Sequence, residues 1–245
     1  MNLIAGMDMR RITISLFFLF SILLSTAVLG QDREVFLRED FTNLEHWTPY
    51  TFPKIKEHTV YSIQREGNQS YLRAESSGSA SGMVYKGKFD VYRYPRLKWR
   101  WWVSNVYQKG NARAKSGDDY PMRVYIAFEY DPGKAGFYQT VRHEAAKIIY
   151  GENLPGSALN YVWTSREDET GILTNPYAEE VKMIPLERGN QHVRQWRDEE
   201  VNILEDYRKA FGADPPRMAS IVIMNDSDNT GDQSTSYMDY IEIFR

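Results

Sequence analysis

RLKWRWWV (Arg96–Val103) and YPMRVYIAFEY (residues 120–130) are the two runs of sequence that decide the fold. Both runs are rich in aromatic and β-branched residues, and both alternate between apolar and polar positions, which is typical of strands with one buried face. The alternation predicts that the buried faces carry Leu97, Trp99, Trp101 and Val103 in the first run and Met122, Val124, Ile126 and Phe128 in the second.

The opposite faces of the two runs are polar and aromatic. If these faces lie on the same side of one sheet, they form a single basic platform on which Trp102 and Tyr125 stand. Guanidinium groups bind carboxylates through paired hydrogen bonds and aromatic rings stack on sugars, so such a platform suits an anionic or uronic-acid glycan. The platform consists of Lys98, Arg100, Trp102, Arg123 and Tyr125, and Lys115 from the loop between the two runs is also expected to bind the ligand.

The first 30 residues have the pattern of a secretory signal peptide. Arg10 and Arg11 precede an apolar run over residues 12–24, and small residues stand before a cleavage point at Gly30. The apolar run is shorter than the roughly 20 residues of a membrane span, although an uncleaved anchor is the alternative. We therefore expect a periplasmic or secreted protein whose mature chain, residues 31–245, is a single domain with no membrane span.

Composition excludes several kinds of function. The net charge is −3, which gives no support to nucleic-acid binding, and the chain has no cysteine, so disulfides, thiolate metal sites and a lipoprotein anchor are excluded. The four histidines are scattered without metal-ligand spacing. Trp47, Trp163 and Trp196 are expected in the core rather than at a ligand.

Short strand-like runs dominate the rest of the chain. They fall at residues 35–41, 59–64, 71–74, 83–89, 158–164, 180–186, 218–224 and 237–244, and the small-residue run 76–82 is expected to be a loop. Apolar residues at helical spacing predict helices over 137–150 and 201–211, each followed by a glycine. This pattern predicts an antiparallel β-sandwich, jelly-roll-like, of the lectin/glucanase or carbohydrate-binding-module kind. The first and last strands are expected to be neighbours.

The mature chain resembles the exported bacterial proteins grouped as domain of unknown function 3047. The resemblance is carried, in order, by EDF (39–41), SASG (79–82), WRWWV (99–103), KSGDDYPMRVYIAF (115–128), LNYVW (159–163), NPY (175–177), EDYRKAFG (205–212) and MNDSDNTG (224–231). It implies a compact β-sandwich but no activity. Trp102 stands where the family is expected to have lysine.

The segment GDDYPMR offers two candidate catalytic residues, Asp119 and Arg123. Four positions apart on a strand, they could share the polar face and, with Lys115, grip or cleave a polar ligand. The structural interpretation is an internal salt bridge that holds the loop to the sheet, with Asp118 bonding in a turn, and it is favoured.

The segment NDSDNTG (225–231) offers a candidate calcium site. Asp226, Asp228 and Thr230, followed by Gly231, match the first half of an oxygen-ligand calcium loop. The flanking element is a strand, and Tyr237 stands where an EF-hand has its bidentate glutamate, so the site would be structural. An Asx-rich turn bonded to its own backbone is the alternative, and both stay open.

Three functional readings follow from these residues. In the first, one sheet face binds a saccharide or another polar ligand. In the second, the protein is a glycan hydrolase or lyase in which Asp119 acts as a base or orients another group. In the third, the protein is an envelope module that binds another protein. A sandwich supports all three, so the sequence does not decide whether the protein is an enzyme.

Overall fold

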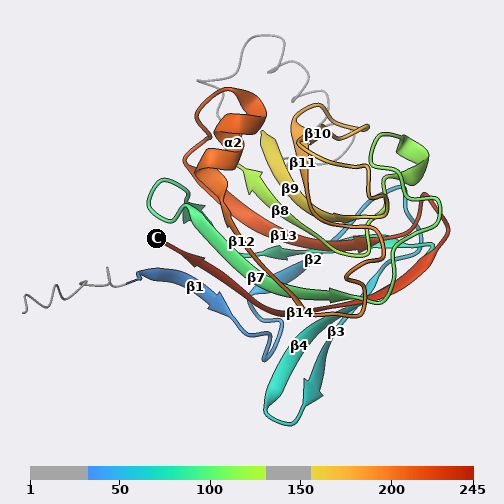
Figure 1. Cartoon of the computed structure of the whole chain (residues 1–245). Coiled ribbons are helices and arrows are strands. Elements are labelled where there is room, and N and C mark those ends of the chain that lie inside the picture. Colours follow the sequence, from blue (N-terminus) through green and yellow to red (C-terminus); the bar gives the residue numbers. More distant parts are fainter. Residues whose placement is uncertain (1–32, 131–155) are drawn as a thin grey trace, which may run out of the picture. The chain divides into compact units, whose positions relative to one another are not determined.

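The computed structural model describes residues 33–130 and 156–245 (Figure 1). The signal peptide predicted over residues 1–30 and the helix predicted over 137–150 lie outside these described residues. Arg33–Arg245 group into one compact unit. The described part consists mainly of strands arranged in two sheets, which confirms the predicted mainly-β sandwich.

Sheet A contains both ends of the described chain. Its strands run in the order β12 (Arg197–Asn202), β7 (Arg96–Val103), β14 (Gln233–Phe244), β4 (Gln69–Ser77) and β3 (Val60–Glu66), and β1 (Val35–Glu39) also pairs with β14. The β1–β14 pair is antiparallel, with Val35 opposite Phe244. The predicted pairing of the first and last strands is therefore confirmed.

Sheet B contains the second of the two defining runs. Its order is β10 (Leu173–Thr174), β11 (Val181–Arg188), β9 (Ser157–Thr164), β8 (Arg123–Phe128), β13 (Met218–Asp226), β5 (Ala80–Tyr85) and β2 (Trp47–Thr51), with β6 (Phe89–Asp90) beside β13. All of its pairs are antiparallel except β11 with β9, which run parallel. Because β9 and β11 are parallel, the chain that leaves the end of β9 crosses back along the sheet to the level where β9 starts, and β11 begins there.

The core lies between the two sheets. Trp99 and Trp101 of β7 are fully buried and face residues of β9, with ring centroids 5.6 Å apart for Trp99 and Tyr161 and 5.7 Å for Trp101 and Trp163. All eight residues predicted for the buried faces of the two defining runs have 0% exposure. Period-2 alternation thus placed both buried faces correctly.

The turns show where local sequence was informative and where it was not. Gly67 has φ +59° between β3 and β4, which confirms the hairpin predicted from its glycine and asparagine. The prediction of a loop over residues 76–82 is wrong. β4 extends to Ser77 and β5 begins at Ala80, so only a short turn remains at Gly78, which has φ +54°. Small residues are acceptable in strands when both faces are covered.

One α-helix and one short 3-10 helix, η1 (Lys115–Gly117), lie in the described connections. The α-helix α2 (Ile203–Phe211) was predicted from residue 201; it begins two residues later because Val201 and Asn202 still belong to β12. Asn202 caps the helix by accepting from the Glu205 N–H, and Gly212 ends it at φ 67°. In the described part of the chain, no helix is long and apolar enough to cross a membrane.

Candidate functional site

The predicted single platform is divided between the two sheets. β7 pairs with β12 and β14 in sheet A, whereas β8 pairs with β9 and β13 in sheet B. Trp102 and Arg100 therefore lie on the outer face of one sheet, and Tyr125 and Arg123 lie on the outer face of the other. The prediction of one basic surface is wrong, because alternation fixes the face of each strand but not the sheet that the strand joins.

Four aromatic side chains meet on the outer face of sheet A. The Trp102 ring is 5.4 Å from that of Tyr237, and the Trp196 ring is 5.2 Å from that of Tyr71 and 6.5 Å from that of Tyr237. Trp102, Trp196 and Tyr237 are half-buried, so parts of their rings reach solvent. We call these four residues the aromatic patch.

Only Trp102 of the aromatic patch was predicted as a ligand residue. Trp47 and Trp163 are buried as expected, but Trp196 is half-buried on the surface, so its assignment to the core is wrong. Trp196 precedes β12 outside any alternating run, which left no periodic signal for its position. Tyr237 could have been found, because Met238 beside it is core and alternation turns Tyr237 outward.

The arginines beside the aromatic patch are paired with carboxylates. Arg100 is 3.3 Å from Asp239 and 3.7 Å from Asp198, and its guanidinium lies over the Trp196 ring at 5.3 Å. Arg73 forms a two-pronged pair with Glu75 and also reaches the Tyr237 hydroxyl. The expected basic excess on this face is therefore largely neutralised. The third predicted cation, Lys98, is half-buried 6.0 Å from the centre of the Tyr240 ring.

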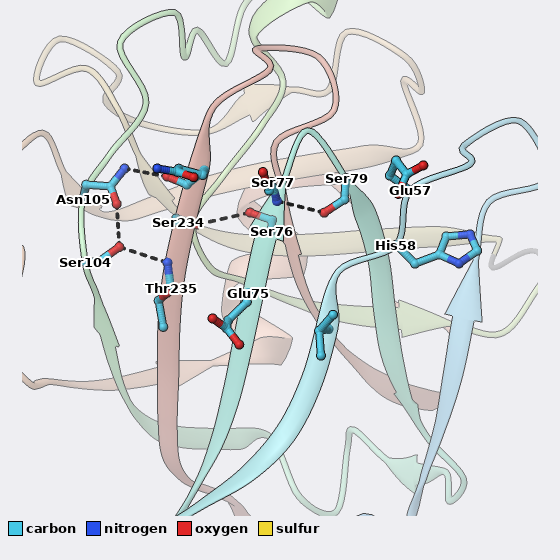
Figure 2. A pocket seen from close by; sticks show the side chains of 12 residues that line it. Glu57, His58, Glu75, Ser76, Ser77, Ser79, Ser104, Asn105, Ser234 and Thr235 are labelled. Atoms are coloured by element: carbon cyan, nitrogen blue, oxygen red, sulfur yellow. Dashed lines mark hydrogen bonds between the residues drawn. The ribbon is translucent and has the colours of Figure 1, made fainter.

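A polar pocket of about 590 Å³ lies at the end of sheet A where β7 stops and β14 starts (Figure 2). Hydroxyl side chains form much of its lining: Ser76, Ser77, Ser79, Ser104, Ser234 and Thr235. The rest of the lining is Glu57, His58, Val60, Glu75, Asn105 and Gln233. Figure 2 shows Ser104 and Asn105 on one side of the pocket, Glu57 on the other, and Ser76 between them.

Buried hydrogen bonds hold the floor of the pocket. The Tyr107 hydroxyl lies 2.6 Å from Ser234 Oγ and 3.1 Å from Ser76 Oγ, and it donates to Asn225 Oδ1 at 3.3 Å. Asn225 is fully buried and its amide also donates to Ser236. Burial raises the pKa of Tyr107, so this hydroxyl stays protonated and available as a donor. A fully bonded network of this kind keeps the hydroxyls of the pocket in fixed positions.

The pocket and the aromatic patch share the same strands. On β14 Thr235 lies two residues before Tyr237, and Ser104, directly after the end of β7, lies two residues after Trp102. Residues two apart on a strand point to the same side and stand about 7 Å apart. Tyr237 is opposite Trp102, and the Ser104 N–H donates to the Thr235 carbonyl. The patch and the pocket are therefore successive rows of one surface.

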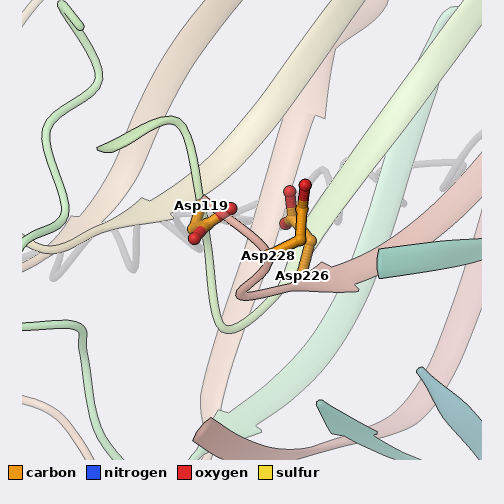
Figure 3. A group of neighbouring side chains, drawn as sticks. All are labelled: Asp119, Asp226 and Asp228. Atoms are coloured by element: carbon orange, nitrogen blue, oxygen red, sulfur yellow. The ribbon is translucent and has the colours of Figure 1, made fainter. Parts of the chain in front are cut away.

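The two other predicted motifs meet each other instead of forming separate sites. The Asp119 carboxylate accepts the Thr230 N–H at 2.6 Å and the Asn229 N–H at 3.3 Å. Figure 3 shows Asp119 on the segment before β8 and Asp226 and Asp228 at the end of β13. Carboxylate oxygens of these three aspartates lie within 4.8 Å of one another.

Arg123 pairs with Asp226. The predicted salt bridge between Arg123 and Asp119 is wrong. Its Nη2 bonds to Asp226, and its Nη1 is 4.0 Å from Asp118. Asp119 and Arg123 are 1% and 4% exposed, so the structural interpretation of this segment is the better one. Lys115, expected beside them, is exposed and lies over the Tyr177 ring at 5.2 Å. Burial raises the pKa of Asp226 well above its usual range, while Arg123 opposes the shift.

A family comparison covers most of the chain. A family model described as "Protein of unknown function (DUF3047)" matches residues 45–242. The chain belongs to the DUF3047 family. This confirms the resemblance seen in the sequence motifs, and it assigns no activity. No curated protein matches this DUF3047 chain.

Several solved structures resemble this DUF3047 chain. The family 11 carbohydrate-binding module of the Clostridium thermocellum cellulase Lic26A-Cel5E is 12% identical, with a TM-score of 0.41 over 86% of this chain and 93% of its own. The family GH12 endoglucanase 3 of Trichoderma harzianum is 8% identical, with a TM-score of 0.43 over 88% and 99%. Winged bean acidic lectin, complexed with methyl-α-D-galactose, is 7% identical, with a TM-score of 0.36 over 81% and 99%. At these TM-scores the likenesses carry no functional argument.

The predicted calcium ligands are only partly brought together in this DUF3047 chain. Asp226 and Asp228 face each other, but the Thr230 hydroxyl bonds within its own turn, to the Ser227 carbonyl and the Asp232 N–H. Asp119 takes the place that Thr230 was expected to fill. Carboxylate oxygens suit calcium, although one Asp226 oxygen is already bonded to Arg123. Calcium at Asp119, Asp226 and Asp228 stays a prediction.

Proposed function

We propose that this protein is an exported saccharide-binding β-sandwich whose ligand lies on the outer face of sheet A, across the aromatic patch and into the pocket. The observation that carries the proposal is the adjacency of the two: half-buried aromatic rings stand one row away from a pocket lined by hydroxyl and amide groups. Export is motivated by the signal-peptide pattern of residues 1–30.

The chemistry of a sugar matches this arrangement. A sugar ring has an apolar face that stacks on an aromatic ring and an edge of hydroxyls that exchange hydrogen bonds. Trp102 and Tyr237 supply the flat surfaces, and Ser104, Asn105 and Thr235 supply donors and acceptors one row further on.

The proposed function is saccharide binding, with no catalytic role for Asp119. The hydrolase or lyase reading depended on Asp119 as a base or orienter, but its carboxylate is 1% exposed and accepts two backbone N–H groups. A base must be within hydrogen-bond reach of the proton that it removes from the substrate. Asp119 therefore supports the loop that follows β13 and does not contact the proposed saccharide.

A glycan array on the purified protein tests the proposal. We expect binding to at least one oligosaccharide class, weakened about fivefold or more in Trp102→Ala and Tyr237→Ala, because each stacked ring contributes on the order of 1 kcal/mol or more. Tyr92→Ala is the matched control, since Tyr92 is 38% exposed and lies away from the patch, beside Pro215.

Three results would contradict the proposal. One is the absence of binding to any glycan on the array, which would favour the protein-binding reading. Another is equal loss of binding in the Tyr92 control. The third is release of reducing ends from a bound polysaccharide, which would make the protein a glycan hydrolase or lyase.

A further inference from the structure

We infer that the pocket prefers an amino sugar to the corresponding uncharged sugar. This rests on the proposed function and names the class of sugar that the same surface takes. The inferred amino sugar replaces the anionic glycan that the sequence predicted, because that prediction depended on a basic platform that the fold divides between two sheets.

The charges that line the pocket are acidic. Glu57 and Glu75 are lining residues, and no lysine or arginine is found among the described residues of the lining. The remaining ionisable side chain is His58, whose Nε2 lies 3.2 Å from the Ile55 carbonyl oxygen. Arg73 neutralises Glu75, and Arg194 lies beside the lining, where its Nε donates to the Ser104 carbonyl oxygen at 3.2 Å. Among the described residues of the lining, Glu57 is therefore the carboxylate without a cation of its own.

The two arginines beside the aromatic patch are already committed to carboxylates. Both terminal nitrogens of Arg73 bond to Glu75, and its Nε donates to the Tyr237 hydroxyl. Arg100 lies between Asp198 and Asp239, with its guanidinium over the Trp196 ring. Turning either guanidinium toward a ligand would break a charge-assisted pair and leave a carboxylate without its partner.

Glu57 is the acidic group that is free for a ligand. Its side chain is exposed, and within the described part of the chain that side chain has no hydrogen bond or ion pair; the Glu57 backbone carbonyl accepts the Ala80 N–H at 3.1 Å. Figure 2 shows it at the side of the pocket opposite Ser104 and Asn105. Glu75, in contrast, is held by Arg73. A protonated amino group on a sugar in the pocket would pair with Glu57.

The neighbouring row extends the ligand beyond one sugar. Trp102 and Tyr237 stand about 7 Å along the strands from Ser104 and Thr235, a distance comparable with the length of one sugar unit. An oligosaccharide would place one ring on the aromatic patch and the next in the pocket. Stacking gives most of the affinity, and Glu57 decides which sugar is preferred.

Calorimetric titration with four oligosaccharides tests the inference: hexamers of glucosamine, N-acetylglucosamine, glucose and galacturonic acid, at pH 6, where the glucosamine amine is protonated. We expect glucosamine to bind about fivefold more tightly than its N-acetyl form, as a solvent-exposed ion pair allows, and more tightly than galacturonic acid. Glu57→Gln should remove this preference, so that glucosamine and N-acetylglucosamine bind with similar affinity.

The control variants separate a specific pair from general attraction between charges. Glu66→Gln changes an equally exposed glutamate at the far end of β3 and should keep the preference. Trp102→Ala should weaken all the neutral and amino oligosaccharides together. Equal loss of preference in the Glu66 and Glu57 variants would overturn the inference.

The failure of the inference is distinguishable from failure of the proposed function. Binding of neutral oligosaccharides with no preference for glucosamine, or tightest binding of galacturonic acid, would overturn the amino-sugar inference and leave saccharide binding intact. No binding of any of the four, together with a negative array, would remove both.

Discussion

At the scale of single residues, the buried charges near the end of β13 determine more of the stability than of the function. Arg123 is 4% exposed and has Asp226 as its bonded partner, with Asp118 at 4.0 Å. Desolvation of such a pair offsets much of its mutual attraction. Loss of one partner is costly, however, because it leaves an uncompensated charge in the interior.

Asp226→Ala should therefore destabilise the protein by about 3 to 5 kcal/mol, because it removes the bonded partner of a buried guanidinium. Chemical unfolding monitored by fluorescence measures the change. Asp168→Ala is the control: Asp168 pairs with Arg113 and Arg166 at 62% side-chain exposure, and its removal should cost less than about 1 kcal/mol. A loss at Asp226 as small as the loss at Asp168 would contradict this account.

Glu199 gives a pH-dependent contribution to stability. Burial and the nearby Glu187 raise its pKa to about 7, while the Trp101 indole donates to its Oε1 at 3.1 Å. Because the folded pKa lies above the unfolded value, this contribution is complete below about pH 4.5 and is lost as the pH rises through 7.

The variant Glu199→Gln should lose less stability between pH 5 and pH 8 than the natural chain, by on the order of 1 kcal/mol after screening by solvent. Unfolding curves at several pH values measure this difference. Glu200→Gln, which changes the exposed partner of Arg96, should follow the natural chain. Parallel curves for all three proteins would show that Glu199 does not titrate in this range.

At the scale of elements, strand β7 separates stability from binding on its two faces. Trp99 has no exposed surface and packs against Tyr161, whereas Trp102 is half-buried on the aromatic patch. The same side-chain type thus occurs in two environments three residues apart. The strand offers an internal comparison in which only the face differs.

Trp99→Ala should cost about 3 to 5 kcal/mol of unfolding free energy, as for other buried aromatic truncations. Trp102→Ala should cost less than about 1.5 kcal/mol and should affect glycan binding instead, because part of the ring already contacts solvent. Thermal or chemical unfolding of both variants, beside their titrations, checks the assignment. A larger loss of stability in Trp102→Ala would mean that the patch is structural.

At the scale of the whole molecule, two distant segments meet at the end of sheet B and concentrate negative charge. Asp119 and Asp228 come from segments more than one hundred residues apart, and Asp226 and Asp118 add to the same region. Burial raises the pKa of Asp118, Asp226 and Asp228. Protons or a bound cation can balance this charge.

If calcium balances the charge, millimolar calcium should raise the melting temperature and a chelator should lower it, because a ligand held only by the native state stabilises that state. Asp228→Asn should remove the response with little change in the stability of the calcium-free protein. An identical melting curve with calcium and with chelator would favour protons and the Asx-rich turn.

Export from the cytoplasm is a predicted property of the whole chain. The pattern of residues 1–30 predicts a mature amino terminus near Gln31 in protein taken from the cell envelope or the medium. Amino-terminal sequencing of the natural protein checks this expectation. A chain that still began at Met1 or Met9 would favour the uncleaved anchor.

The sequence by itself determined what depends on near neighbours in the chain. It placed Trp99 and Trp101 inside and Trp102 outside, because successive side chains of a strand point to opposite faces. It also placed the β3–β4 turn at Gly67 and the end of α2 at Gly212, because both glycines adopt positive φ. These features come from backbone sterics and local periodicity.

Only the tertiary structure decided which strands share a sheet and which side chains form a site. It separated Trp102 from Tyr125, brought Trp102 and Trp196 to opposite sides of Tyr237, and brought Asp119 to Asp226. Each of these results depends on the pairing partner of a strand. That partner is chosen by packing between segments far apart in the chain, and alternation within one strand carries no information about it.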